Sequence, residues 1–192
     1  TVQAEATFLS DTEVQLKIDT KKETITFDHC IIAAGSSSSV IPGIPFENEN
    51  VLTSKTALDL KKIPKSLLVI GGGYIGLEMG TVFSALGASV SVAEFLPNLL
   101  PGADPDLVKP LARKLKKEFN QILLSTKITK VEESSTGGLS VTMERDGKEN
   151  IETYDQVLVS VGRRPNTDKM GVNTTGIKVD KQGFISVDKY QK

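Results

Sequence analysis

The chain has 192 residues, with 23 basic and 24 acidic side chains and a formal net charge of −1 at pH 7. Without a basic excess there is no electrostatic argument for nucleic-acid binding, and no apolar run approaches the roughly 20 residues that span a bilayer. A hydrophobic content of 39% suits one large domain, or one domain and part of another.

The cysteine content predicts a reducing, intracellular compartment, because the single cysteine, Cys30, has no partner for an internal disulfide. No signal peptide is visible, and the sequence begins at Thr1 rather than at a methionine. We therefore expect the sequence to be a piece cut from a longer chain.

The first part of the chain predicts short antiparallel strands, because apolar and polar side chains alternate there. The alternating stretches are residues 2–9, 13–18 and 24–27. The apolar run CIIAAG at 30–35 predicts a buried strand that holds Cys30 as a small apolar thiol. The Ser-, Pro- and Gly-rich segment 36–50 predicts a crossover between domains.

The middle of the chain predicts a right-handed α/β wind with a parallel sheet, because strands and helices alternate. A short helix with a Ser or Thr cap is expected at 53–62. The expected strands that follow are 66–71, 89–95 and 121–125, and the expected helices between them are 74–87 and 104–119.

The second of these helices has a clear start signal, with Asp104 as the N-cap and Pro105 at the first helical position. Pro110 lies inside the pattern and predicts a kink or a late helix start. The expected apolar stripe consists of Leu107, Val108, Leu111, Leu115 and Phe119.

The last part returns to strands. A meander with glycine-containing turns is expected over residues 127–134, 138–147 and 149–154. A buried strand is expected at 155–162, and one edge strand at 183–192. Together these elements predict an α/β, Rossmann-like FAD/NAD(P)-binding fold with a parallel sheet, helices and a β-meander.

Gly71, Gly73 and Gly76 form a G-x-G-x-x-G motif between the strand at 66–71 and the helix at 74–87. In a dinucleotide site the first glycine permits a tight turn, the second lets a pyrophosphate approach the backbone, and the third lets helix and strand pack closely. The helix N-terminus then offers N–H groups and a positive dipole end to the phosphates.

Glu94 ends the next expected strand, 18 residues after Gly76 and near the expected spacing of about 20. Its carboxylate can accept both hydroxyls of an adenosine ribose and would repel a 2′-phosphate, and residues 95–100 contain no Lys or Arg. The pattern predicts an NAD(H) site rather than an NADP(H) site. The alternative is a tight turn in another Rossmann-like protein.

Four motifs in this order resemble the flavoprotein pyridine nucleotide-disulfide reductases, and in particular the dihydrolipoamide dehydrogenases of the 2-oxo-acid dehydrogenase complexes. They are CIIAAGS, LLVIGGGYIGLEMG, VAEFLPNLLPGADPDL and VLVSVGRRPNT. The resemblance covers nearly the whole chain. It implies NAD and FAD as cofactors, and a parent enzyme that oxidises dihydrolipoamide to lipoamide with NAD through FAD and a redox disulfide. The acid in AEF separates the chain from family members that bind NADP.

The resemblance also implies residue roles. The glycine loop would wrap the NAD pyrophosphate and nicotinamide side with Gly71, Gly72, Gly73, Tyr74, Ile75, Gly76, Leu77 and Glu78. Glu94 would bind the adenosine ribose, Ile128 the adenine end, and Gly162 the nicotinamide half. Glu78, by itself more typical of a solvated helix residue, would lie by the nicotinamide and the flavin ring. The strand end that touches FAD would be Ala34, Gly35 and Ser36, although the family often has Thr at position 34.

Other family features are not found in the sequence. The FAD glycine motif and the C-x4-C redox pair are absent, and the resemblance implies no catalytic role for Cys30 or for the single histidine, His29. No metal site is expected. We therefore expect a central piece of the family's chain, without catalytic residues and inactive on dihydrolipoamide by itself.

The expected division of that piece is a partial FAD domain at 1–36, an NAD domain at 37–165, and a return segment at 166–192. The parent would be a homodimer associated with 2-oxo-acid dehydrogenase complexes, in a bacterial cytoplasm or a mitochondrial matrix, with no nucleic-acid or membrane partner. The alternatives are a non-catalytic NAD-binding module, a mercuric reductase, NADH oxidase or other two-dinucleotide flavoprotein, and an unrelated Rossmann protein such as a methyltransferase.

Overall fold

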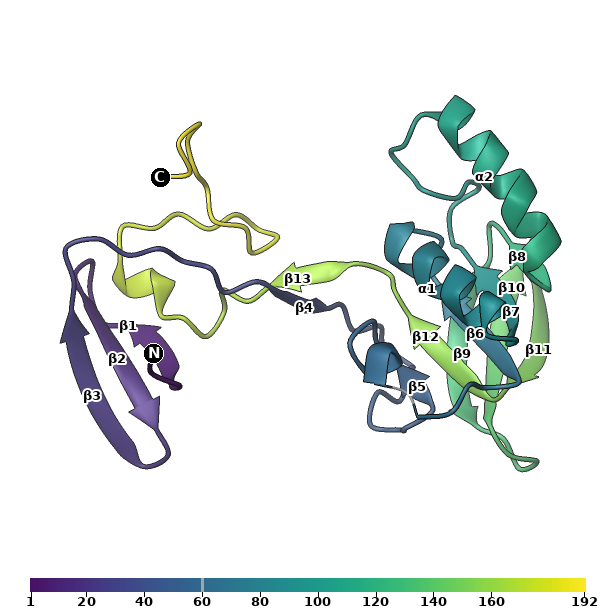
Figure 1. Ribbon diagram of the computed structural model, residues 1–192, viewed down its shortest axis with the longest axis horizontal. Coiled ribbons are helices and arrows are strands. Elements are labelled where there is room, and N and C mark those ends of the chain that lie inside the picture. The colour runs from purple at the N-terminus through teal and green to yellow at the C-terminus, as the bar shows by residue number, and fades with distance from the viewer. Residues whose placement is uncertain (60) are drawn as a thin grey trace. The chain divides into compact units, whose positions relative to one another are not determined.

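The computed structural model describes residues 1–59 and 61–192. The chain forms two compact units (Figure 1). The smaller unit joins residues 1–37 with residues 163–192, and the larger unit is residues 38–162. Within the described part of the chain, no helix is long and apolar enough to cross a membrane.

A five-stranded parallel sheet forms the centre of the larger unit and confirms the predicted α/β fold. Its strands in spatial order are β5 (Val51–Leu52), β12 (Gln156–Val159), β6 (Ser66–Ile70), β7 (Ser89–Ala93) and β8 (Gln121–Leu123). Successive strands β7 and β8 lie on one side of β6, whereas β12 lies on its other side. In open α/β sheets, ligands bind at the carboxyl ends of the strands where the order reverses in this way.

Two helices follow the first two strands of the wind. Helix α1 (Tyr74–Ala85) packs Leu77 and Phe83 into an apolar core on one face of the sheet. Helix α2 (Pro105–Glu118) completes this core through Leu115. As predicted, Asp104 caps α2, because its Oδ1 accepts a hydrogen bond from the Asp106 N–H at 2.9 Å.

Helix α2 begins at Pro105 and continues through Pro110. Of the two outcomes predicted for Pro110, the late start therefore does not occur, and the kink stays a prediction. The predicted apolar stripe was wrong in one residue. Leu107 is 76% exposed and is not part of the apolar stripe. The residues that pack against the core, Val108, Leu111 and Leu115, are spaced by three and four positions, and this spacing turns Leu107 away from the sheet.

The predicted meander forms a separate antiparallel sheet beside the parallel one. Its strands are β9 (Lys127–Glu133), β10 (Leu139–Arg145) and β11 (Lys148–Tyr154). Val131, Val141 and Tyr154 enter a second core with Leu68 and Val157 of the parallel sheet. The Asp146–Gly147 turn between β10 and β11 has φ of 52° and 72°, the left-handed pair that a tight hairpin requires.

The helix expected at 53–62 is a single 3-10 turn over Thr56–Asp59, and Leu60 lies outside the described residues. The predicted Thr cap is present. The Thr56 N–H donates to the Thr53 Oγ1 at 3.3 Å, and the Thr53 N–H donates to the Thr56 Oγ1 at 2.9 Å. These reciprocal bonds hold a turn but do not extend it into an α-helix.

The smaller unit contains the predicted N-terminal strands as an antiparallel sheet of β1 (Glu5–Phe8), β2 (Glu13–Ile18) and β3 (Lys21–Thr26). Phe8 meets Phe27 edge to face, with ring centroids 6.1 Å apart. A two-stranded sheet pairs β4 (Ser36–Ser38) with β13 (Arg163–Pro165), and a 3-10 turn follows at Val172–Thr174.

Two predicted strands are not observed. Residues 30–35 form no regular element, Ile31 is 94% exposed, and Cys30 is exposed rather than buried. An apolar run becomes a buried strand only when other strands cover it, and none of the described strands pairs with this segment. The segment 183–192 contributes an isolated bridge between Ile185 and Val179 instead of an edge strand.

Candidate functional site

The glycine motif forms a tight turn at the carboxyl end of β6, beside the strand-order reversal. Gly71 has φ of 110°, a conformation that favours glycine. A Cβ on Gly71 would lie 2.6 Å from the Ser160 carbonyl oxygen on the neighbouring strand. A Cβ on Gly76 would overlap the Gly71 carbonyl oxygen and lie 2.5 Å from the Ser160 Oγ. Both positions therefore require glycine for the fold itself.

The middle glycine of the motif is different. Gly73 is the N-cap of α1, with φ of −76° and ψ of 176°, and no side chain caps the helix at this end. No heavy atom lies within 4 Å of where its Cβ would be. The first N–H groups of a helix have no partner within the helix, so this turn has both the space and the donors to bind an anion.

Glu94 lies directly beside the glycine turn, although the two are separated by 22 positions in the sequence. Its Oε2 accepts a hydrogen bond from the Gly72 N–H at 2.6 Å, and its Oε1 accepts one from the Leu96 N–H at 2.7 Å. The side chain is 7% exposed. An ionised carboxylate offers about four lone-pair sites, so both oxygens retain capacity for ribose hydroxyls.

The loop after β7 closes against the same turn. The Leu100 N–H donates to the Gly72 carbonyl oxygen at 2.9 Å, and Leu99 is buried against Gly72. Glu94 therefore joins the glycine turn on one side to residues 95–100 on the other.

Ser160 was missed by sequence reasoning. Its Oγ donates to the Ile70 carbonyl oxygen at 3.1 Å and to the Gly71 carbonyl oxygen at 3.3 Å. These bonds fix the end of β6 from the adjacent strand. The signal in the sequence was a polar residue ending the apolar run 155–162, but its meaning depends on knowing that β12 pairs with β6.

The remaining nucleotide candidates lie around this edge or beside the second core. Tyr74 and Glu78 are exposed on α1, while Ile75 is half-buried and Leu77 is buried. Ile128 is partly buried and packs against the second core, which lies between the meander and the parallel sheet. Gly162 follows β12 with φ of 127°, and its carbonyl oxygen accepts a hydrogen bond from the Ser39 N–H at 3.0 Å.

The segment 34–36 is brought together with 163–166, more than 125 positions later in the chain. The Asn166 side chain donates its Nδ2 to the Ala34 carbonyl oxygen at 3.0 Å, and the Asn166 N–H donates to the Gly35 carbonyl oxygen at 3.1 Å. The Arg163 Nε donates to the Ser36 Oγ at 2.7 Å, and its Nη2 donates to the Ser36 carbonyl oxygen. The AAGS and RRPN motifs are thus one structural feature.

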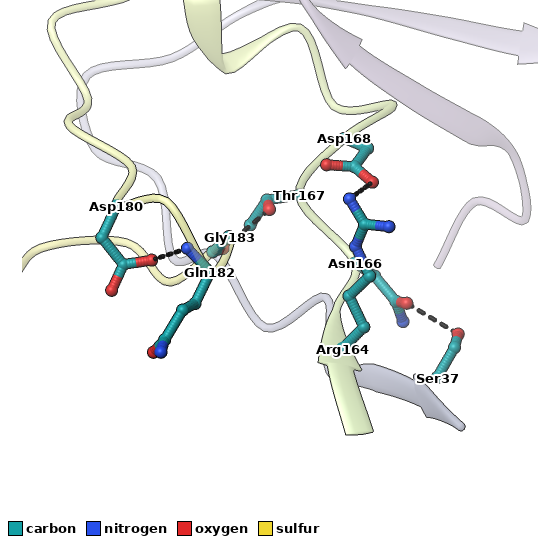
Figure 2. Close-up of polar contacts among 8 residues, drawn as sticks. All are labelled: Ser37, Arg164, Asn166, Thr167, Asp168, Asp180, Gln182 and Gly183. Atoms are coloured by element: carbon teal, nitrogen blue, oxygen red, sulfur yellow. Dashed lines mark hydrogen bonds and ion pairs between the residues drawn. The ribbon is translucent and has the colours of Figure 1, made fainter. Parts of the chain in front are cut away.

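Figure 2 shows how the chain after β13 continues this network. The Ser37 Oγ donates to the Asn166 Oδ1 at 2.7 Å, and Arg164 pairs with Asp168 at 3.1 Å. The Thr167 Oγ1 donates to the Gly183 carbonyl oxygen at 2.8 Å. Thr167 is one of the few buried polar residues, so this bond anchors the C-terminal turns.

His29 and Cys30 are both exposed, and they lie together on the irregular segment before Ala34. Among residues 1–59 and 61–192, no group of three or more His, Cys, Asp or Glu side chains is arranged to hold a metal ion.

The fold and the glycine turn are those of a dinucleotide-binding protein, and the chain belongs to the pyridine nucleotide-disulphide oxidoreductase family, which it matches over residues 2–192. Membership implies binding of FAD and a pyridine nucleotide. The resemblance drawn from the sequence motifs is therefore confirmed at the level of the family.

Similar proteins include dihydrolipoyl dehydrogenases from several organisms. The protein of Haemophilus influenzae is 43% identical over 192 residues, which is 100% of this chain and 40% of that protein. The Vibrio cholerae protein is 40% identical over 96% of this chain and 39% of its own length. The mitochondrial protein of Dictyostelium discoideum is 41% identical over 88% of this chain and 35% of its own length. The chain thus spans about two-fifths of the length of these relatives.

A similar solved structure is the Cu(II) complex of the HOCl-induced flavoprotein disulfide reductase RclA from Escherichia coli. It has a TM-score of 0.85 and 25% sequence identity, and the match covers 97% of this chain and 41% of that one.

Proposed function

We propose that the chain is the NAD(H)-binding part of a dihydrolipoyl dehydrogenase, the enzyme that oxidises dihydrolipoamide with NAD through FAD and a redox disulfide. In this proposal the nucleotide-binding part is residues 37–165, of which residues 38–162 form the larger compact unit. Residues 1–36 and 166–192 belong to the flavin domain. The identity of about 40% to dihydrolipoyl dehydrogenases supports the choice within the family.

The observation that carries the proposal is the contact between Glu94 and the Gly72 N–H. It puts a carboxylate at the edge of a glycine turn that has open space at Gly73. A pyrophosphate on the turn would have its adenosine ribose within reach of that carboxylate. The chain therefore has groups suited to the two ends of an adenosine diphosphate unit, and the donor set fits a dinucleotide.

The same carboxylate supports NAD(H) over NADP(H). A 2′-phosphate would carry nearly two negative charges toward a buried acid, and like charges at close range are unfavourable in a low-dielectric site. The next side chain, Phe95, offers no compensating positive charge.

The remaining roles extend along the same edge. Gly162 adjoins the nicotinamide half, Glu78 faces the nicotinamide and the flavin ring, and Ile128 contributes to the adenine end. Ala34, Gly35 and Ser36 contact FAD, and their backbone positions are fixed by Arg163 and Asn166. When bound, the nicotinamide supplies the hydride acceptor, while this chain binds and orients it. The whole enzyme is a homodimer within a 2-oxo-acid dehydrogenase complex, in the bacterial cytoplasm or the mitochondrial matrix.

The proposal is tested by titrating NADH and NADPH separately into the chain and into Glu94→Ala. Glu94 also accepts two backbone hydrogen bonds, so this variant loses stability as well as affinity. The readout is therefore the ratio of the two affinities, which does not depend on the folded fraction. We expect the wild-type chain to bind NADH more tightly than NADPH. In Glu94→Ala the ratio of the two affinities should fall about tenfold or more, since hydrogen bonds to charged groups contribute about 1.5–3 kcal/mol.

Asp155→Ala is the matched control. The Asp155 Oδ2 also accepts two backbone N–H groups, from Lys65 at 2.7 Å and Ser66 at 3.3 Å, but at the opposite, amino-terminal edge of the sheet. This variant should lose stability while keeping the wild-type ratio. Equal affinity of the wild-type chain for NADH and NADPH would refute the proposed specificity, and binding of neither would refute the site.

A further inference from the structure

The tip of the hairpin between β10 and β11 carries Asp146 and Gly147, the only place in the sequence where Asp or Asn directly precedes a glycine. At such a pair the amide nitrogen of the glycine can reach the preceding side-chain carbonyl carbon, because glycine has no side chain to obstruct the approach. The Asp146 side chain is 83% exposed. No heavy atom outside the adjacent residues lies within 4 Å of the position that a Cβ on Gly147 would take, so neither group is crowded.

Few contacts hold this tip in place. The last pair of the β10–β11 ladder joins Arg145 to Lys148, so the peptide of Gly147 lies beyond the ladder. No hydrogen bond from the Gly147 N–H is found among residues 1–59 and 61–192. The Asp146 Oδ2 lies 3.8 Å from the Arg145 Nε, and an ion pair between two exposed side chains contributes little. The Asp146 side chain and the Gly147 peptide can therefore rotate toward each other in local openings of the tip.

Asp19 offers a matched comparison within the same chain. It is the first residue of the turn between β2 and β3, it is exposed, and its φ of 53° is close to the 52° of Asp146. The residue that follows Asp19 is Thr20, whose β-branched side chain restricts the backbone beside the amide nitrogen. Asp180, in a turn of the smaller unit, is held more firmly, because its Oδ1 accepts two backbone N–H groups at 2.8 and 2.9 Å. Asp146 therefore combines a free carboxyl group with an unobstructed nitrogen, whereas Asp19 lacks the glycine.

We propose that Asp146 is a site of spontaneous modification, at which the aspartate residue converts to isoaspartate in the folded chain. The Gly147 nitrogen forms a bond to the Asp146 Cγ, and the carboxyl group loses one oxygen as water, together with its own proton and the amide proton. The product is a cyclic succinimide, and water then adds to one of its carbonyl carbons. Addition at Cγ restores aspartate, whereas addition at the main-chain carbon breaks the bond from that carbon to Gly147 and leaves isoaspartate. The composition is unchanged, and no cofactor or oxidant is needed.

The modification changes the backbone as well as the side chain. Isoaspartate adds one methylene to the main chain and moves the free carboxylate onto the α-carbon, so the turn no longer has the backbone length that pairs Arg145 with Lys148. Further along the hairpin the strands are anchored, because Val141 and Tyr154 are buried in the second core. We therefore expect the change to open the tip and to leave the rest of the meander folded.

The test is to incubate the folded chain in water labelled with heavy oxygen and to map its peptides by mass spectrometry, with isoaspartyl and aspartyl peptides separated by chromatography. Each opening of the succinimide places one heavy oxygen on the residue. We expect labelling at Asp146 to be at least about tenfold faster than at Asp19, which corresponds to a barrier about 1.4 kcal/mol lower. Gly147→Thr should lower labelling at Asp146 to the rate of Asp19, and Thr20→Gly should raise labelling at Asp19 toward the rate of Asp146.

Equal labelling rates at Asp146 and Asp19 in the wild-type chain would overturn the inference. So would labelling of Asp146 that occurs only in the urea-unfolded chain, because the hairpin would then protect the residue. Thr20→Gly provides a check that does not depend on the β10–β11 hairpin keeping its shape. An unchanged rate at Asp19 in that variant would also overturn the inference, because the following glycine would then not control the reaction.

Discussion

Substitution of Gly73 can distinguish an effect on folding stability from an effect on nucleotide binding. In Gly73→Ala the new methyl group points into space where no heavy atom lies within 4 Å, and φ of −76° suits alanine. Alanine is a poorer N-cap than glycine by roughly 0.5–1 kcal/mol, while the smaller entropy of the unfolded chain returns about 0.4–1 kcal/mol. The free energy of unfolding should therefore change by less than about 0.5 kcal/mol.

Binding should respond differently. If a pyrophosphate approaches the backbone at Gly73, the methyl group occupies its place, and NADH affinity should fall at least about tenfold, or 1.4 kcal/mol. Urea unfolding measures the first quantity and calorimetric titration the second. Gly176→Ala is the matched control, because that exposed glycine also has an ordinary φ and room for a Cβ. A stable Gly73→Ala that binds NADH as the wild type does would refute the reasoning about this turn.

Three further predictions concern stability. Gly76→Ala should lose at least about 1–3 kcal/mol in urea unfolding, because its Cβ has no room against the turn; an unchanged midpoint would contradict this. Burial, and the hydrogen bond to Glu152, raise the pKa of Tyr154 to about 12. This stabilisation is complete below pH 10 and is lost as pH rises from 10 to 12, on the order of 2–3 kcal/mol, so Tyr154→Phe should flatten the unfolding free energy over that interval. Leu115→Ala should cost about 2–5 kcal/mol and Leu107→Ala less than about 0.5, and similar losses would contradict the assigned packing of α2.

Much of the larger unit could be predicted from the sequence because its signals are local. The apolar strands, the glycine turn and the Asp104 cap each occupy a few adjacent residues. The alternation of strands and helices along the chain then predicts a parallel sheet with right-handed connections. The position of Glu94 at the end of its strand was likewise predictable from spacing alone.

The errors came from contacts between distant segments. The apolar composition of 30–35 predicts burial, but burial depends on partners that no local pattern reveals. The hydrogen bonds of Ser160 to the end of β6 depend on a pairing across about 90 positions. The sequence indicated a ligand role for Glu94 but gave no sign that the same carboxylate holds Gly72 and Leu96 in place.

The central claim is that a pyridine nucleotide binds on the glycine turn with its adenosine ribose at Glu94. The most direct measurement is a titration of the isotope-labelled chain with NADH, followed by backbone amide NMR. The account predicts that the largest shift changes occur at the amides of Gly72, Gly73 and Leu96, with little change at Ser66 on the opposite edge of the sheet. Saturable binding that leaves the glycine-turn amides unmoved would contradict it.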